Sequence, residues 1–240
     1  LVGSEMCIRD SELYAEFEQQ LPGRFFVESI DIPFNFSTIN NRAAKKAHGE
    51  YLLFLNNDTE VITENWLTLM VSFAQQERIG CVGAKLLYPN NTVQHAGVIL
   101  GLGGVAGHGH YGYPHGDLGY FGRLAINVNY SAVTAACLLM KKADFDAVGG
   151  FEEAFTVAFN DVDLCLKVQA LGRDNVWLHE AELYHFESQT RGYDDKGKKK
   201  KRFEQEKVMM EEKWGPLIEN DPFYNPNLTR DIPNFSLRID

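Results

Sequence analysis

The stretch that most constrains the fold runs from Glu50 to Asp58 (EYLLFLNND). Five consecutive large apolar residues lie between Glu50 and three polar residues. A short apolar run bounded by turn residues is typical of a strand buried on both faces, and the helical patterns beside it favour a parallel sheet. Ligands of open α/β sheets bind at the carboxyl ends of strands, where Asp58 stands. Flanked by Asn56 and Asn57, Asp58 suits a hard divalent cation; the alternative is a turn that only stops the strand.

Helical and extended patterns alternate along the rest of the chain. The expected elements, in order, are helix 12–21, strand 24–32, helix 37–48, strand 50–58, helix 63–74, strands 80–88, 92–100 and 132–140, helices 144–148 and 161–171, strands 175–178 and 183–186, and helix 203–214. Ser37 or Thr38 can cap the third element, and Thr63 the fifth. This order predicts an α/β fold with a doubly wound mixed sheet, followed by a helical and extended C-terminal tail over 216–240.

Charge and cysteine content restrict the partners and the compartment. The 240 residues carry a formal net charge of -10, which disfavours nucleic acid as a partner because phosphate binding needs a basic face. Four cysteines form no C-x-x-C pair, no apolar run is long enough to span a bilayer, and no signal-peptide pattern occurs. We therefore expect a cytoplasmic protein. The basic run 196–202 is either a solvated face or a peripheral contact with the anionic inner face of the membrane.

Composition also suggests where the folded unit begins and ends. Residues 1–11 (LVGSEMCIRDS) show no periodicity and look non-native, so they are excluded from the fold. The expected division is this non-native segment, a domain over 12–195 that is incomplete at its N-terminal end, and a C-terminal helix and tail over 196–240.

The glycine-rich segment 101–122 imitates a dinucleotide-binding fingerprint in its first residues. No helical pattern follows it, and no acidic residue ends a next strand at the right distance, so the context rules against a nicotinamide site. His108 and His110 form an H-x-H pair that could bind a metal. We expect a mobile loop that closes over a substrate, or a plain surface loop.

Acidic residues at 161 and 163 open a helix after Asn160. Asn160 alone could cap that helix, so the two carboxylates exceed what capping requires, and one of them can act as a general base toward a hydroxyl. His185 follows a strand pattern and precedes a polar segment that holds Ser188 and Arg191. A lone histidine is often structural, but imidazole suits divalent metals and an arginine fork suits phosphate oxygens. Together these groups fit transfer from a nucleotide-activated donor.

From Phe34 onward the chain resembles the inverting family 2 glycosyltransferases of GT-A fold, specifically the branch that builds bacterial surface polysaccharide such as O-antigen. The resemblance rests on five blocks in the right order: FNFSTINNRAAKKAHGEYLLFLNNDTEV, QHAGVILGLGGVAGH, SAVTAACLLM, GGFEEAFTVAFNDVDLCLKV and ELYHFESQTRG.

The resemblance implies a role for each site residue. Asp58 would hold Mg or Mn against the donor diphosphate, with Asn56 in place of the first acid of a D-x-D motif, and His185 would be a further metal ligand. Asp161 would be the catalytic base. The remaining assignments are donor contacts at Asn41, Asn56, Asn57, Ser188 and Arg191, and acceptor contacts at Ala136, Cys137, Asp163 and His108.

The implied reaction is a single in-line displacement with inversion. Asp161 deprotonates the acceptor hydroxyl, whose oxygen attacks the anomeric carbon, while the metal stabilises the leaving nucleoside diphosphate. The family's first strand, with its base-recognising aspartate, is absent, so we expect weak donor binding. Two alternatives remain: a sugar-phosphate nucleotidyltransferase, and a non-catalytic sugar-nucleotide-binding domain of a larger protein.

Overall fold

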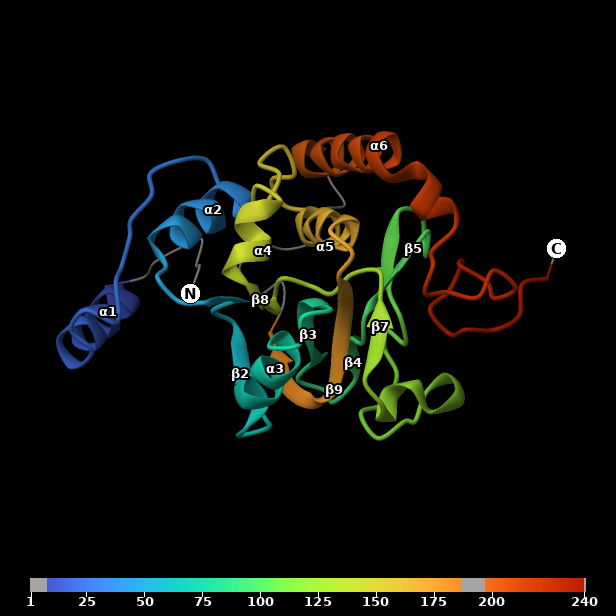
Figure 1. Cartoon of the computed structure of the whole chain (residues 1–240), viewed down its shortest axis with the longest axis horizontal. Helices are drawn as coiled ribbons and strands as arrows, with labels where there is room; N and C mark the ends of the chain where they lie inside the picture. Colours follow the sequence, from blue (N-terminus) through green and yellow to red (C-terminus); the bar gives the residue numbers. More distant parts are fainter. Residues whose placement is uncertain (1–7, 187–196, 240) are drawn as a thin grey trace.

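The computed structural model describes residues 8–186 and 197–239, which form a mixed sheet covered by helices on both faces (Figure 1). The main sheet has seven strands, with the order β1-β8-β3-β9-β2, β4 paired to β3, and β7 paired to β9. Its strands are β1 Tyr51–Leu55, β2 Thr59–Val61, β3 Ile79–Leu87, β4 Val93–His95, β7 Val128–Tyr130, β8 Cys137–Lys141 and β9 Asp174–His185. The mixed α/β architecture expected from the sequence is confirmed.

Strand β1 lies at one end of the sheet and runs antiparallel to β8, with Leu55 opposite Cys137. The expectation of a parallel sheet around β1 is therefore wrong, and the parallel pairing occurs between β3 and β9 instead. The local apolar run could not reveal this, because a strand's direction relative to its neighbour depends on the long connection between them. The abrupt polar end of β1 nevertheless falls where the sequence indicated.

Two apolar cores lie on opposite faces of the sheet. Leu52 and Phe54 of β1 belong to the larger core, which is also packed by α2 Phe36–Lys46, α4 Lys142–Ala147 and α5 Asn160–Ala170. Helix α3 Trp66–Ala74 covers the other face, where Met70 and Ala74 are fully buried. The predicted stripe of apolar residues on this helix is thus core, except at Leu67, which is 40% exposed.

Several elements differ from the sequence expectation. Residues 24–32 form no strand: Phe26 is 77% exposed, and extended propensity produces a strand only beside a neighbouring ladder. Helix α2 is capped by Asn35, whose side chain accepts from the Thr38 backbone N–H at 3.0 Å, and not by Ser37 or Thr38. Helix α3 begins after Asn65, without a side-chain cap at Thr63.

The strands after residue 92 are also divided differently. The expected strand 92–100 splits into β4 and β5 Val98–Leu100, and β5 pairs with β6 Ala106–His108 in a small second sheet. The two short strands expected over 175–186 are one strand, β9. The glycine-rich segment holds β6 and leads to the 3-10 segment η1 Tyr120–Ala125, and His110 within it is fully buried.

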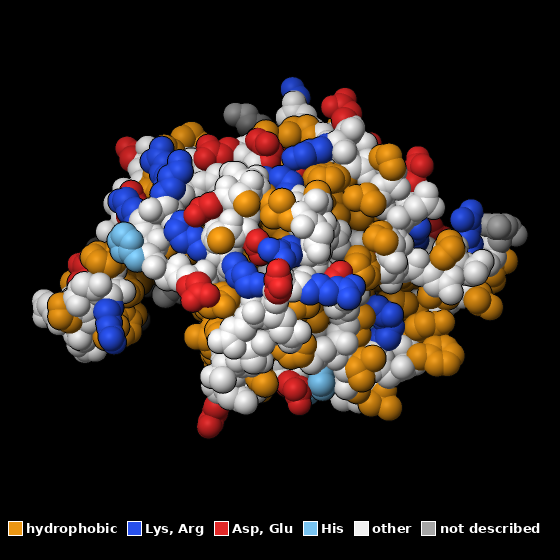
Figure 2. All heavy atoms as spheres, viewed as in Figure 1, with side chains coloured by type: hydrophobic (Ala, Val, Ile, Leu, Met, Phe, Trp, Pro, Cys, Tyr) orange, Lys and Arg blue, Asp and Glu red, His pale blue; other side chains and the backbone are white. Residues whose placement is uncertain are grey.

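A helix lies near each end of the described chain (Figure 1). In the same view, basic and acidic side chains are interspersed over the surface (Figure 2). Helix α1 Ile8–Gln20 begins inside the segment that looked non-native and places Phe17 against Phe25, with ring centroids 5.6 Å apart. Helix α6 Gly197–Glu219 lies along α5 and includes residues 216–219, which were expected in the tail. Residues 220–239 follow it as turns and irregular backbone.

Candidate functional site

The turn Thr134–Ala136, just before β8, joins the two acidic segments of the candidate site. On one side the Asn56 backbone N–H, at the end of β1, donates to the Ala136 carbonyl at 3.0 Å. On the other side the Ala135 backbone N–H donates to Asp161 Oδ2 at 3.0 Å. The carboxyl end of β1 and the N-terminus of α5 therefore meet across one short turn, although they are far apart in sequence.

Asp58 and His185 lie together because β2 pairs antiparallel with the end of β9. Thr59 stands opposite His185, and the Phe186 N–H donates to the Asp58 carbonyl at 2.9 Å. This pairing places His185 Nε2 at 3.1 Å from Asp58 Oδ1, and the amide Nδ2 of Asn56 at 3.2 Å from the same nitrogen. The adjacency of Asp58 and His185 expected from the sequence resemblance is thus present in the fold.

Gln94 sets the chemistry of His185. Its side chain is buried, and its carbonyl Oε1 lies 2.7 Å from His185 Nδ1, which therefore donates a proton to it. In the neutral imidazole, Nε2 then carries a lone pair that accepts from the Asn56 amide, 3.1 Å from Asp58 Oδ1. A divalent cation that took His185 Nε2 and Asp58 Oδ1 as ligands would replace the Asn56 amide at Nε2, and a partner on the second ring nitrogen is the usual support of a metal-binding histidine. Protonated His185 would instead form an ion pair with Asp58.

Asp161 projects from the first turn of α5 and is half-buried. Its Oδ1 accepts from the Val162 N–H at 2.9 Å, while its Oδ2 accepts from Ala135. Both bonds are made to backbone donors, so each carboxylate oxygen keeps capacity to accept a further proton. Asn160 does not cap the helix as expected: the residue at the cap is Phe159, in a left-handed conformation with φ of 60°, and the Asn160 amide donates to the Val157 carbonyl.

The loop before Asp161 is fixed from two sides. From α2, the Ser37 hydroxyl donates to the Phe155 carbonyl at 2.6 Å, and the Phe36 N–H donates to the Thr156 carbonyl at 2.9 Å. From α6, the buried carboxylate of Glu206 accepts from the backbone N–H groups of residues 156, 157 and 158. Sequence reasoning missed both Glu206 and Gln94, because nothing in their local pattern identifies a partner so distant along the chain.

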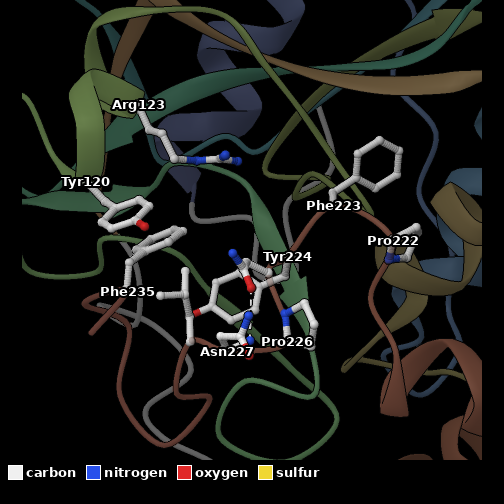
Figure 3. A pocket seen from close by; sticks show the side chains of 10 residues that line it. Tyr120, Arg123, Pro222, Phe223, Tyr224, Pro226, Asn227 and Phe235 are labelled. Carbon is white, nitrogen blue, oxygen red and sulfur yellow. Dashed lines mark hydrogen bonds between the residues drawn. The ribbon is translucent and has the colours of Figure 1, made fainter. Parts of the chain in front are cut away.

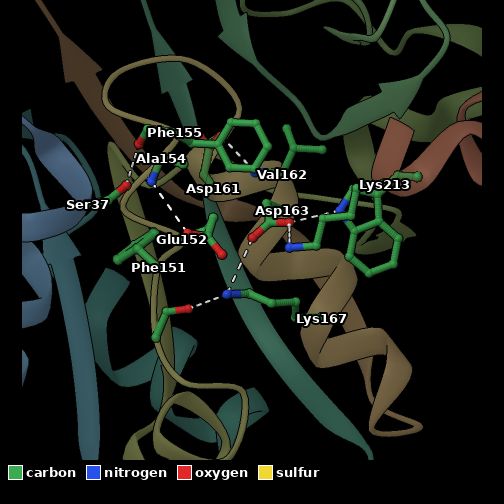
Figure 4. A network of polar contacts seen from close by, with 12 residues as sticks. Ser37, Phe151, Glu152, Ala154, Phe155, Asp161, Val162, Asp163, Lys167 and Lys213 are labelled. Carbon is green, nitrogen blue, oxygen red and sulfur yellow. Dashed lines mark hydrogen bonds and ion pairs between the residues drawn. The ribbon is translucent and has the colours of Figure 1, made fainter. Parts of the chain in front are cut away.

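Asp163 is fully buried and holds α6 against α5 (Figure 4). Its Oδ1 accepts from Lys213 Nζ at 2.6 Å and from the Trp214 indole N–H at 2.8 Å, and its Oδ2 lies 3.4 Å from Lys167 Nζ. Three hydrogen-bonding or charged side chains from two helices enclose the Asp163 carboxylate. This placement is at odds with the expected contact between Asp163 and the acceptor glycan.

Two more expected contact residues turn inward. Asn41 is buried, and its amide forms two hydrogen bonds of 2.9 Å with the backbone of Phe151. The amide therefore fixes the backbone at Phe151 and does not face a nucleotide-sugar donor. Cys137 is also fully buried; its thiol lies 3.9 Å from Met70 Sδ, and burial raises its pKa to about 12. Neither side chain is exposed to a ligand, while the neighbouring Ala136 contributes its backbone to the central turn.

His108 lies at the rim of the same region, against the buried His95. The Thr134 N–H donates to His95 Nε2 at 3.3 Å, so the proton of His95 sits on Nδ1 and is donated to His108 Nδ1 at 2.8 Å. Burial, followed by the charges of the neighbouring histidines, lowers the pKa of His95 well below its usual range. The His95–His108 pair therefore contacts the turn Thr134–Ala136 through the Thr134 N–H.

The remaining expected residues divide between the surface and the undescribed segment. Asn57 is exposed in the turn after β1. Ser188 and Arg191 lie outside the described residues. Within the described ranges 8–186 and 197–239, no group of three or more His, Cys, Asp or Glu residues could hold a metal by itself, and no helix is long and apolar enough to cross a membrane.

Comparison with known sequences relates most of the chain to one family. Residues 10–147 match the family described as Glycosyl transferase family 2. Protein y4gI of Sinorhizobium fredii (strain NBRC 101917 / NGR234) is 53% identical over 206 residues, which are 85% of this chain and 23% of that protein. O-antigen biosynthesis protein RfbC of Myxococcus xanthus is 40% identical over 230 residues, 95% of this chain and 18% of that protein. The chain spans about a fifth of the length of these relatives.

Two solved structures share the fold at low sequence identity. The mannosyltransferase PcManGT of Pyrobaculum calidifontis, in complex with GDP-Man and Mn2+, aligns with a TM-score of 0.58 and 13% identity over 88% of this chain and 52% of that one. GalNAc-T7, with UDP, GalNAc and Mn2+, aligns with a TM-score of 0.67 and 12% identity over 88% of this chain and 40% of that one.

Proposed function

Because the chain belongs to glycosyl transferase family 2 and has the GT-A fold of its structural neighbours, we propose that it transfers a sugar, with inversion, from a nucleoside-diphosphate sugar to a glycan hydroxyl. The O-antigen biosynthesis protein among its relatives supports cell-surface polysaccharide as the product. The observation that carries the proposal is that the turn Thr134–Ala136 bonds on one side to Asp161 and on the other to Asn56, which contacts His185 of the Asp58–His185 pair.

Asp161 is the proposed general base. Its carboxylate is held by two backbone donors at the N-terminus of α5, so it cannot rotate away when it accepts a proton from the acceptor hydroxyl. The deprotonated oxygen forms a bond to the anomeric carbon, and the bond from that carbon to the diphosphate breaks. Asp161 carries the proton after the step, and the nucleoside diphosphate leaves with the bonding electron pair.

The Asp58 and His185 side chains fit a divalent cation. They offer one oxygen and one nitrogen ligand 3.1 Å apart, once the Asn56 amide moves off His185 Nε2, and Gln94 keeps the second ring nitrogen of His185 protonated. When bound, such a cation neutralises negative charge on a diphosphate. The Mn2+ in the complexes of PcManGT and GalNAc-T7 supports this proposal.

Asp161→Asn tests the proposed base. We expect transfer, measured by mass spectrometry of acceptor glycans incubated with a panel of UDP, dTDP and GDP sugars and Mn2+, to fall by at least ~100-fold. Asp146→Asn is the matched control, because Asp146 is a solvent-exposed acid whose side chain forms a surface ion pair with Lys142. Unchanged transfer by Asp161→Asn would contradict the assigned role and would favour a non-catalytic domain.

Contact with an anionic membrane surface is proposed for the start of α6, where Lys200 and Lys201 are exposed. Each basic residue near such a surface contributes about 1 kcal/mol, so replacing both with Gln should weaken binding to anionic vesicles by roughly tenfold or more. Co-sedimentation with phosphatidylserine vesicles measures this. Equal sedimentation of wild type and variant would show that these lysines form a solvated face. Lys196, the first residue of the basic run, lies outside the described residues.

A further inference from the structure

The C-terminal tail folds back over η1 and borders an open pocket of about 600 Å³ (Figure 3). This volume lies within the range of small-molecule sites in proteins. The residues that matter for its chemistry are Tyr120, Arg123, Tyr224, Asn225, Asn227 and Phe235. None of them belongs to the site formed by Asp58, Asp161 and His185.

Arg123 gives the pocket its charge. It is half-buried, its Nε donates to the Tyr130 hydroxyl at 3.4 Å, and its guanidinium carbon lies 5.0 Å from the Tyr130 ring and 5.6 Å from the Phe235 ring. In the described part of the chain, no carboxylate pairs with this guanidinium. Figure 3 shows its nitrogen atoms reaching between the side chains that line the pocket.

Stacked aromatic rings form a rigid wall beside Arg123. The Tyr120 ring lies 5.3 Å from the Phe235 ring at an interplanar angle of 11°, and the buried His110 ring stacks on the Phe235 ring at 4.2 Å. The Tyr224 hydroxyl donates to the Thr229 carbonyl at 2.6 Å, which fixes another ring of the wall. These contacts place the rings before any ligand arrives, so little conformational entropy is lost on binding.

The two kinds of group suit different parts of one ligand. Phe235 and Tyr224 are only 3% and 5% exposed and are buried within the wall, so the half-buried Tyr120 ring is the one that can pack against the C–H face of a sugar. The exposed amides of Asn225 and Asn227 can bind hydroxyls, and the terminal nitrogens of an arginine fork match a carboxylate in two places. A bare phosphate would use only Arg123 and would leave the aromatic wall without a role.

We propose that this pocket binds a saccharide unit that carries a carboxylate, and that it is a subsite for an acidic glycan acceptor, separate from the reaction centre. The assignment of the glycan as acceptor rests on the proposed function. A second holding point would keep a growing chain on the protein while its terminal hydroxyl reacts.

Isothermal titration of the 240-residue chain with a galacturonic acid trisaccharide, in low salt and without any sugar donor, tests the proposal. The neutral galactose trisaccharide and inorganic phosphate are titrated in parallel. We expect the acidic trisaccharide to bind most tightly, and Arg123→Gln to weaken it by about tenfold or more, because a charge-assisted bidentate contact is lost. Arg42→Gln, which removes an exposed arginine of α2, should leave binding unchanged.

Two further variants protect the test against simple misfolding. Arg123→Lys keeps the charge but loses the fork, and is expected to bind more weakly than wild type while unfolding at a similar temperature. Asn227→Ala removes an exposed amide and should weaken binding severalfold. Asp161→Asn should bind the trisaccharide like wild type while losing transfer, which separates this subsite from the proposed reaction.

Four results would overturn the proposal. The first is no binding of the acidic trisaccharide at millimolar concentration. The second is equal binding of the acidic and neutral trisaccharides. The third is binding of the acidic trisaccharide that Arg123→Gln does not change. The fourth is phosphate binding as tight as that of the acidic trisaccharide, which would make the pocket a simple anion site.

Discussion

Replacing Glu206 with Ala should cost more stability than any exposed substitution on α6, because its carboxylate is the acceptor for a whole loop. Glu206 is 2% exposed and accepts from Thr156 N at 2.7 Å, Thr156 Oγ1 at 2.7 Å, Val157 N at 3.2 Å and Ala158 N at 2.9 Å. Bonds to a charged group contribute roughly 1.5–3 kcal/mol each, so four of them amount to ~6–12 kcal/mol before any correction.

The net effect is smaller, because the variant no longer buries a charge. Removing a buried carboxylate recovers a desolvation penalty of several kcal/mol, so we expect a net loss of about 3–5 kcal/mol in the free energy of unfolding. Glu206→Gln should lose about 2 kcal/mol, because one carbonyl oxygen remains while the amide N–H group faces backbone donors.

Urea unfolding, followed by circular dichroism with the slope of the transition compared between variants, measures both losses. Glu204→Ala is the matched control, since Glu204 is an exposed acid on the same helix and should change stability by less than ~0.5 kcal/mol. A loss of under ~1 kcal/mol for Glu206→Ala would refute the claim that this carboxylate holds the loop before Asp161.

Other consequences can be checked separately. Burial lowers the pKa of His110 to about 4 from an ordinary 6.5, with a smaller contribution from the charge of Arg123. As the pH falls, His110 is protonated in the unfolded chain before it is protonated in the folded one. The stability that depends on neutral His110 is therefore complete above about pH 6.5 and is lost as the pH falls toward 4. In His110→Gln the side-chain oxygen can still accept from the Tyr120 N–H. We expect this variant to lose roughly 2–3 kcal/mol less unfolding free energy, measured with urea, than wild type between about pH 6.5 and 4. The same loss in variant and wild type would contradict the assigned role of His110. Gln94→Ala should raise the Mn2+ concentration needed for half-maximal transfer by about 10–100-fold, because His185 loses its orienting partner. The same change at the exposed Gln75 should have no effect.

Local sequence patterns predicted the strands and helices that carry the site, because the candidate catalytic and metal-binding residues lie where a strand or helix begins or ends. Asp58 follows β1, Asp161 opens α5, and His185 ends β9. The pairing of these elements is a long-range property. The apolar run at residues 51–55 gives no information on its antiparallel partner β8, and residues 24–32 have strand propensity but no ladder to join.

The supporting residues of the site could not be found in the same way. Gln94 contacts His185 across 91 positions, and Glu206 contacts the loop before Asp161 across about 50. The sequence motifs also did not reveal which of their residues are buried. Asp163 and Cys137 belong to segments on which the family resemblance rests, yet other elements pack over both residues and bury them fully.

The way Glu206 holds its loop has a consequence for how such chains can diverge. At Val157 and Ala158 it recognises only main-chain amides, which every residue except proline possesses. Mutational drift at these two positions should therefore be tolerated, provided that proline is avoided, while position 206 stays acidic. The contact between Asp163 and Lys213 joins two side chains, so a change in either should require a compensating change in the other. A library randomised at these positions and sorted for folded protein should show free variation at 157 and 158, apart from proline, and paired changes at 163 and 213.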